Sequence, residues 1–305
     1  MSLDIRSFFD PVTSTFTHVV HAPGQAQCAV VDAVLGYDPV TRLTDTHMAD
    51  EVKAYIQARG LQLQWLLETH VHADHLSAAS YLRAELGGRI GISGRIMEVR
   101  CTLADRYGPF KQKPYDHLFA TDEVFHIGPL RTQALAVPGH TPADIAYLVN
   151  DEVVFVGDTL FPPDVGTARC DFPGGSAKTL YRSIQRLLSL PAHVQMMMCH
   201  DYPPRDRAPI VECTVAEQRS TNIHARSGIS EAEFIEMRTQ RDRTLPAPRL
   251  LGPSMRANLG GLANGSNFPQ LSLTRCMKQV QELGLSPEVE SQFLYENARR
   301  VFKLS

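Results

Sequence analysis

Residues 69–75 read THVHADH, and this short stretch decides how the rest of the chain is interpreted. It places three histidines and an aspartate directly after the apolar run Trp65-Leu66-Leu67. Imidazole and carboxylate groups are costly to bury without partners, so a strand end this rich in them is expected to bind something charged. A metal cation is the first candidate, and the rest of the chain should then supply further ligands.

Three more segments place a histidine or an aspartate just after an apolar strand. His140 lies in PGHT, Asp158 lies in FVGD, and His200 lies in CHDY. The carboxyl ends of strands are where α/β folds place their sites, so these residues are expected to meet the motif at 69–75. The seven candidate ligands are His70, His72, Asp74, His75, His140, Asp158 and His200, whereas His18, His21, His47, His117, His126, His193 and His224 are expected to be structural.

The chain around these segments alternates short apolar strands with amphipathic helices. Strands are predicted at 27–34, 63–69, 122–127, 131–137, 144–149, 152–157 and 194–199, and helices at 46–60, 75–87, 176–189, 212–226 and 230–242. Ser230 and Glu233 form a capping-box pattern at the start of the last helix. This alternation predicts an α/β layered fold rather than a helical bundle or an all-β barrel.

A Pro-rich turn at 245–253 and a Gly-rich stretch at 260–265 end this alternation. We therefore expect a main catalytic domain over 1–250 and a C-terminal extension over 251–305. Two short helices are expected after the turn, the last of them beginning at Ser286 as its N-cap.

Composition and charge exclude several classes of protein. A formal net charge of −3, with both signs scattered, argues against nucleic acid or an anionic membrane as a partner. The chain lacks the ~18 consecutive apolar residues of a membrane span, and its start MSLDIRSFFD lacks the apolar core of a secretory signal. Six cysteines without CxxC pairs indicate reduced thiols, as in the cytoplasm or an organelle matrix. A two-fold homodimer is the default expectation on base rates.

THVHADH, PGHT, VGD and CHDY together resemble the metallo-β-lactamase superfamily, over about residues 5–250. The resemblance implies an α/β fold, an αββα sandwich with its metal site at one edge, here followed by a short C-terminal helical extension. It also implies the metal ligands. In the superfamily's dinuclear zinc hydrolases the positions of His70, His72 and His140 hold one metal, those of Asp74, His75 and His200 hold the other, and that of Asp158 bridges them.

Residues 157–175, GDTLFPPDVGTARCDFPGG, are similar to the persulfide dioxygenase (sulfur dioxygenase) branch, which is related to glyoxalase II. This resemblance implies one Fe(II) on His70, His140 and Asp158, with the other four candidate ligands surrounding it. Two histidines and a carboxylate leave open positions for a sulfur ligand and dioxygen. The implied reaction oxidises glutathione persulfide, or a similar small persulfide, with O2 to sulfite and thiol.

Two other functions stay open at this point. All seven ligands of a dinuclear site are present, so a hydrolase of the glyoxalase II or lactonase type with two Zn(II) ions is the alternative. A non-catalytic metal- or thiol-sensing protein would be expected to have lost a strand-end ligand, and none is lost.

Arg169 is the first candidate for binding the substrate, because it matches an arginine of the family's segment. Its planar guanidinium suits a substrate carboxylate, although an ion pair with Asp171 is the structural alternative. Cys170 follows Arg169, and a neighbouring cation lowers a thiol's pKa, but an inert thiol is the expectation.

Tyr202 and Asn258 are the other candidate substrate residues. The Tyr202 hydroxyl is expected either to donate to the bound substrate or only to pack. Asn258 matches the asparagine of an Asn-x-Arg-x-Gly pattern near the family's thiol-binding mouth. Gly260 occupies the position of that pattern's arginine, so the contacts to a glutathione carboxylate stay open.

Overall fold

The computed structural model describes residues 3–110, 114–204 and 206–261, together with Ser286 and Val289. One compact unit extends from Met1 to Gly265. The α/β fold predicted from the alternation of strands and helices is confirmed.

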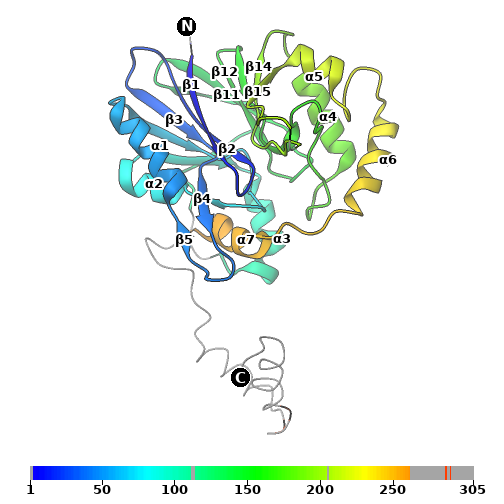
Figure 1. The fold of residues 1–305 in the computed structure, drawn as a ribbon, viewed down its shortest axis with the longest axis horizontal. Coiled ribbons are helices and arrows are strands. Elements are labelled where there is room, and N and C mark those ends of the chain that lie inside the picture. Colours follow the sequence, from blue (N-terminus) through cyan, green and yellow to red (C-terminus); the bar gives the residue numbers. More distant parts are fainter. Residues whose placement is uncertain (1–2, 111–113, 205, 262–285, 287–288, 290–305) are drawn as a thin grey trace. The chain divides into compact units, whose positions relative to one another are not determined.

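Two mixed sheets form the centre of this unit (Figure 1). The first has the order β1 (Asp4–Asp10), β2 (Thr15–His21), β3 (Gln27–Val31), β6 (Gln62–Leu67), β8 (Arg89–Ser93) and β9 (His117–Phe119). The second has the order β10 (Glu123–Ile127), β11 (Leu130–Ala136), β12 (Ile145–Val149), β13 (Val153–Phe155), β14 (Gln195–Met197) and β15 (Glu212–Thr214). A small third sheet joins β5 (Thr44–Asp45), β4 (Val34–Tyr37) and β7 (Leu76–Ser77).

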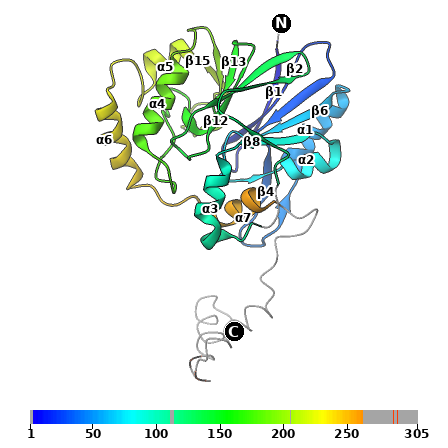
Figure 2. The same ribbon diagram turned by 180° about the vertical axis from the view of Figure 1, so that it is seen from behind.

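Helices cover the outer faces of both sheets, which gives an αββα arrangement (Figures 1 and 2). The first sheet carries α1 (His47–Ala58) and α2 (Ala79–Leu86), and the second carries α4 (Ala177–Leu188) and α5 (Val215–Thr221). The helix α6 (Glu231–Asp242) packs against α4. Near one end of the sheets, α3 (Ile96–Tyr107) packs against α7 (Leu251–Gly260). The predicted capping box at Ser230 and Glu233 is confirmed, since each side chain bonds the other residue's backbone N–H.

The core between the sheets contains a cluster of aromatic side chains. Trp65 and Phe119 of the first sheet meet Phe125 and Tyr147 of the second, with the Trp65 and Phe125 ring centroids 5.3 Å apart. Burying each such side chain contributes about 1.5–3 kcal/mol, so this cluster fixes the two sheets face to face. The loops at the shared edge of the two sheets are therefore held in fixed positions relative to one another.

Several elements differ from the sequence prediction. The strand predicted at 27–34 is divided into β3 and β4, because Asp32 has a φ of 52° and turns the chain. The helix predicted from residue 75 begins only at Ala79, because Leu76 first pairs with Leu35 of β4. The hairpin of β1 and β2 and the helix α3 lie in segments where no strand or helix is predicted.

The compact unit also continues past the predicted boundary at residue 250. Met255 and Leu259 of α7 are fully buried against α3 and the metal-motif loop, so α7 belongs to the main unit. Ser286 Oγ accepts a bond from Val289 N at 3.4 Å, as expected for an N-cap, but the rest of the predicted extension lies outside the described residues.

In the part of the chain that the structure describes, no helix is both long enough and apolar enough to span a membrane. Five of the six cysteines lie in the described residues and all five are free thiols, in agreement with the reduced state expected from their spacing.

Candidate metal centre

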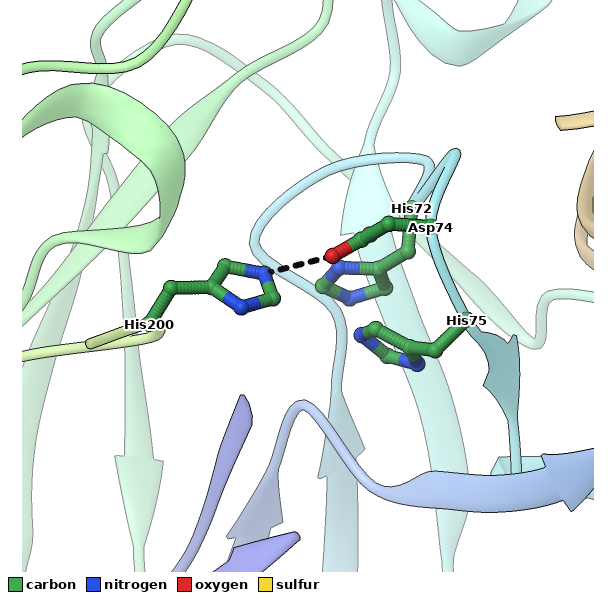
Figure 3. A group of neighbouring side chains, drawn as sticks. All are labelled: His72, Asp74, His75 and His200. Atoms are coloured by element: carbon green, nitrogen blue, oxygen red, sulfur yellow. Dashed lines mark ion pairs between the residues drawn. The ribbon is translucent and has the colours of Figure 1, made fainter. Parts of the chain in front are cut away.

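The seven predicted ligands converge at one edge of the two sheets. His70 follows β6, His140 follows β11, Asp158 follows β13 and His200 follows β14, so each of these candidate ligands lies just after an apolar strand. Figure 3 shows the loop residues His72, Asp74 and His75 facing His200, which comes from the opposite sheet. The potential ligand atoms of these seven residues form two groups, and within each group the ligand atoms lie no more than 4.8 Å from one another.

The first group, called the triad here, comprises His70, His140 and Asp158. Asp158 Oδ2 lies 3.7 Å from His70 Nε2 and 3.6 Å from His140 Nε2. These separations are too long for hydrogen bonds. They suit neighbouring ligands of one ion, because metal–ligand distances of about 2.1 Å place adjacent ligand atoms about 3 Å or more apart.

Both triad histidines are oriented through their other ring nitrogen. Thr69 Oγ1 lies 2.9 Å from His70 Nδ1 and itself donates to Asp32, so it accepts the Nδ1 hydrogen. His140 Nδ1 donates to the backbone oxygen of Arg169 at 2.6 Å. Burial, with help from the neighbouring imidazoles, holds the pKa of His70 well below its usual value. Both Nε2 lone pairs are thus available for a metal.

The second group, called the quartet here, comprises His72, Asp74, His75 and His200. Asp74 Oδ2 lies 3.2 Å from His200 Nε2, the ion pair marked in Figure 3. Asp158 Oδ1 lies 3.5 Å from the same nitrogen. Asp158 therefore turns one oxygen to the triad and the other to the quartet, which is the position of a bridging ligand.

Several buried polar atoms at the centre of the two groups lack a hydrogen-bond partner in the described part of the chain. They are His70 Nε2, His72 Nδ1, His75 Nε2, His200 Nε2 and Asp158 Oδ1. Buried polar groups nearly always have partners, so five such atoms converging on one place need an explanation. A metal bound by these residues provides one, and nitrogen and carboxylate ligands suit both Fe(II) and Zn(II).

His72 lies beside two carboxylates that the sequence did not identify as its partners. Its Nε2 lies 3.1 Å from Asp32 Oδ1 and 3.1 Å from Glu68 Oε2, and both carboxylates are buried. Burial alone would lower the pKa of His72, but the two carboxylates raise it well above its usual value. Asp32 ends an apolar strand and Glu68 directly precedes the motif, so both met the strand-end criterion used for the other ligands.

Two adjoining cavities open beside the triad. One of about 320 Å³ is lined by Asp158, Phe161 and Tyr202, among others, and the other of about 270 Å³ by Leu103 and Phe172, among others. Both share His140. The Tyr202 ring stacks on the His200 ring at 5.7 Å between centroids and is about half exposed. Whether the Tyr202 hydroxyl donates a hydrogen bond to the substrate stays a prediction.

Arg169 lines both cavities but is already engaged within the protein. Its Nε and Nη2 donate to the two oxygens of Asp171 at 2.6 and 2.7 Å, and Nη1 donates to the Pro246 backbone oxygen at 2.6 Å. These contacts match the structural alternative considered for this arginine. Substrate binding by Arg169 stays a prediction.

Asn258 lies beneath the metal motif rather than at either cavity beside the triad. Its Nδ2 donates to the backbone oxygens of His72 and His75, at 2.8 and 3.0 Å, and its Oδ1 accepts from Ser77 N at 2.9 Å. All its observed side-chain contacts are therefore with the loop that carries the ligands. Substrate binding by Asn258 stays a prediction.

Cys170 is a buried thiol beside Asp242. Burial, and then the Asp242 carboxylate, raise the pKa of this thiol to about 12. At neutral pH it is therefore protonated, which favours the inert interpretation over a nucleophile.

Comparison with known proteins gives this geometry a context. A family model described as the metallo-beta-lactamase superfamily matches residues 11–200. A probable metallo-hydrolase of Burkholderia pseudomallei is 44% identical over 271 residues, covering 84% of this chain and 92% of that protein. Glyoxylase B2 of Dictyostelium discoideum is 46% identical over 241 residues, covering 76% of this chain and 82% of its own.

Persulfide dioxygenases are more distant relatives. The mitochondrial persulfide dioxygenase ETHE1 of Homo sapiens is 29% identical over 257 residues, covering 84% of this chain and 87% of that protein. The crystal structure of ETHE1 from Myxococcus xanthus matches with a TM-score of 0.68 and 28% identity, covering 84% of this chain and 98% of that one.

Proposed function

The chain belongs to the metallo-beta-lactamase superfamily, and we propose that it is a persulfide dioxygenase acting on glutathione persulfide or a similar small persulfide. The reaction is GSSH + O2 + H2O → GSH + SO3²⁻ + 2 H⁺, in which sulfur gives four electrons to dioxygen. The similarity to ETHE1 over most of both chains supports this assignment.

The observation that carries the proposal is the triad. Its two imidazole nitrogens lie 3.6 and 3.7 Å from one carboxylate oxygen and are turned to a common point. A 2-His-1-carboxylate face of this kind is typical of non-haem iron oxygenases. A ferrous ion held there supplies a redox-active centre with open positions for sulfur and dioxygen, which zinc does not provide.

The chain's own residues orient and enclose the reacting groups. Thr69 and the Arg169 carbonyl hold the triad imidazoles in the required tautomer. Phe161 and Tyr202 border the cavity beside Asp158, where apolar surface keeps bulk water from the persulfide. In this assignment the Tyr202 hydroxyl donates to the substrate sulfur.

The second candidate function is a hydrolase of the glyoxalase II or lactonase type with two zinc ions. The complete quartet and the two-sided position of Asp158 favour it, because together they offer a second metal site. The similarity to Glyoxylase B2 and to a probable metallo-hydrolase also supports it.

A paired assay separates the two functions. Protein reconstituted anaerobically with iron, and separately with zinc, is given glutathione persulfide while oxygen uptake and sulfite are measured, and S-D-lactoylglutathione while hydrolysis is measured. We expect oxygen uptake and sulfite in equal amounts from the iron form alone. Rapid thioester hydrolysis by the zinc form, without oxygen uptake by the iron form, would establish the hydrolase instead.

A further inference from the structure

The cavities beside the triad carry more arginine than their internal pairing uses. Arg169, Arg238 and Arg241 line the larger cavity, and Arg106 and Arg169 line the smaller one. The acidic residues in these linings are Asp74, paired with His200, Asp171, paired with Arg169, and Asp158 of the triad. Arg241 and Arg106 therefore have no carboxylate partner among these residues, and an unpaired guanidinium in a substrate cavity suits an anionic ligand.

Two of these arginines are fully engaged in holding the protein together. Arg169 binds Asp171 and the carbonyl of Pro246. Arg238 is buried, donates to Asp242 at 2.8 and 2.6 Å, and donates to the carbonyl of Thr167 at 3.0 Å. Both guanidinium groups are therefore fixed in place by several bonds within the protein.

Arg241 and Arg106 are different. Both are exposed, and in the described part of the chain neither guanidinium makes an ion pair or a hydrogen bond. Arg106 lies over the Tyr107 ring, with 5.3 Å from its Cζ to the ring centroid, and Tyr107 lines the same cavity. Their planar guanidinium groups are therefore free to bind a carboxylate through two parallel hydrogen bonds.

The two free arginines reach the site from different directions. Arg241 is in the last turn of α6, which packs against α4, whereas Arg106 is near the end of α3, beside α7 (Figure 2). Their cavities meet at His140. A ligand whose sulfur lies at the triad would thus extend one arm toward each arginine.

From this arrangement we propose that Arg241 and Arg106 bind the two carboxylates of a thiol peptide of the glutathione type, one carboxylate each. The assignment rests on the proposed function in placing the substrate sulfur at the triad. It names two residues that sequence reasoning missed, and it makes them, rather than Arg169, the determinants of specificity for a substrate with two anionic ends.

The test is glutathione binding to the metal-loaded protein, measured by calorimetry without turnover. Arg241→Ala and Arg106→Ala should each weaken binding roughly 10- to 100-fold, the usual effect of losing a charge-assisted bidentate contact. Arg243→Ala is the matched control, because Arg243 is an exposed arginine two residues from Arg241 that does not line either cavity. It should bind glutathione as the parent does.

Two glutathione analogues identify which end each arginine binds. One has its glycine carboxylate replaced by a carboxamide, and the other, γ-aminobutyryl-cysteinyl-glycine, lacks the glutamyl α-carboxylate. For each arginine variant, the loss of affinity should nearly vanish with one analogue and persist with the other, and the two variants should show opposite patterns. Sensitivity of both variants to the same analogue would overturn the two-ended arrangement.

The binding result is independent of the reaction catalysed. Glutathione affinity that is equal in the Arg241, Arg106 and Arg243 variants, or no measurable glutathione binding by the parent, would refute the arginine assignment. If binding depends on both arginines but the iron form takes up no oxygen with glutathione persulfide, the subsite stands and the dioxygenase proposal fails.

Discussion

The triad and the quartet lie side by side, yet their histidines have different partners. The triad imidazoles are held by neutral groups, the hydroxyl of Thr69 and the carbonyl of Arg169. In the quartet, His72 faces the carboxylates of Asp32 and Glu68, and His200 faces that of Asp74. Two of the three quartet histidines, His72 and His200, therefore have anionic partners of their own, whereas the triad has only Asp158.

This difference suggests how the same seven side chains can hold one metal in a dioxygenase and two metals in a hydrolase. Burial lowers the pKa of His70, which keeps its imidazole neutral and ready to bind a cation. Although burial alone would lower the pKa of His200, Asp158 and Asp74 raise it. Asp74 and Asp158 can thus offset a charge on His200 without a second ion, and we infer that the triad is the site a single metal fills first.

The largest effect should come from the triad itself. His140→Ala and Asp158→Asn each remove one of three ligands, so both should lose bound iron and at least about a thousand-fold in turnover. Iron content after desalting and oxygen uptake are the measurements. Retention of stoichiometric iron by either variant would show that the triad is not the primary site.

A change in the quartet should be much milder. Asp74→Asn keeps the triad intact, so it should retain iron and lose activity by about 10- to 100-fold at most. Loss of metal by Asp74→Asn to the same extent as by Asp158→Asn would refute the distinction between triad and quartet. That result would require the quartet to hold an essential ion.

Asn258 is expected to affect both groups moderately, because it bonds the loop that carries ligands of each. Asn258→Ala removes three buried hydrogen bonds, which should lower the free energy of unfolding by about 2–3 kcal/mol and weaken iron binding several-fold. Denaturant unfolding and metal competition measure these effects. A variant with unchanged stability and metal affinity but a raised KM would instead support the substrate role predicted from the sequence.

The smallest effect should follow a change outside both groups. Cys170→Ala should leave kcat and KM within about two-fold of the parent, because a thiol whose pKa is raised to about 12 does not act as a nucleophile near pH 7. A loss of turnover greater than ten-fold, in a variant that keeps its iron, would give Cys170 a catalytic role.

The meeting of the candidate ligands at one place could be predicted from the sequence because its signals are local. Four of the candidates, His70, His140, Asp158 and His200, each follow a short apolar strand, and the ends of these strands meet at one sheet edge in the fold. The motif at 69–75 gave four of the seven candidates by itself. Strand boundaries were less accurate where a single residue such as Asp32, with positive φ, turns the chain.

The contacts that decide whether a polar side chain holds the protein together or faces a cavity could not be predicted, because they join distant parts of the chain. Asn258 reaches the motif across more than 180 positions, and Arg169 bonds the carbonyl of Pro246, 77 positions away. Arg241 and Arg106 look like ordinary surface arginines in the sequence. Only the folded chain shows that both line the cavities beside the triad.

The most direct test of the central claim is an anaerobic titration of metal-free protein with Fe(II). After each addition an aliquot is transferred to oxygenated buffer, and its oxygen uptake with glutathione persulfide is measured. If the triad alone forms the working site, activity rises linearly and reaches its maximum at one iron per chain. A maximum reached only at two metals per chain, or oxygen uptake that never exceeds the metal-free background while two zinc ions restore hydrolysis, would contradict the account.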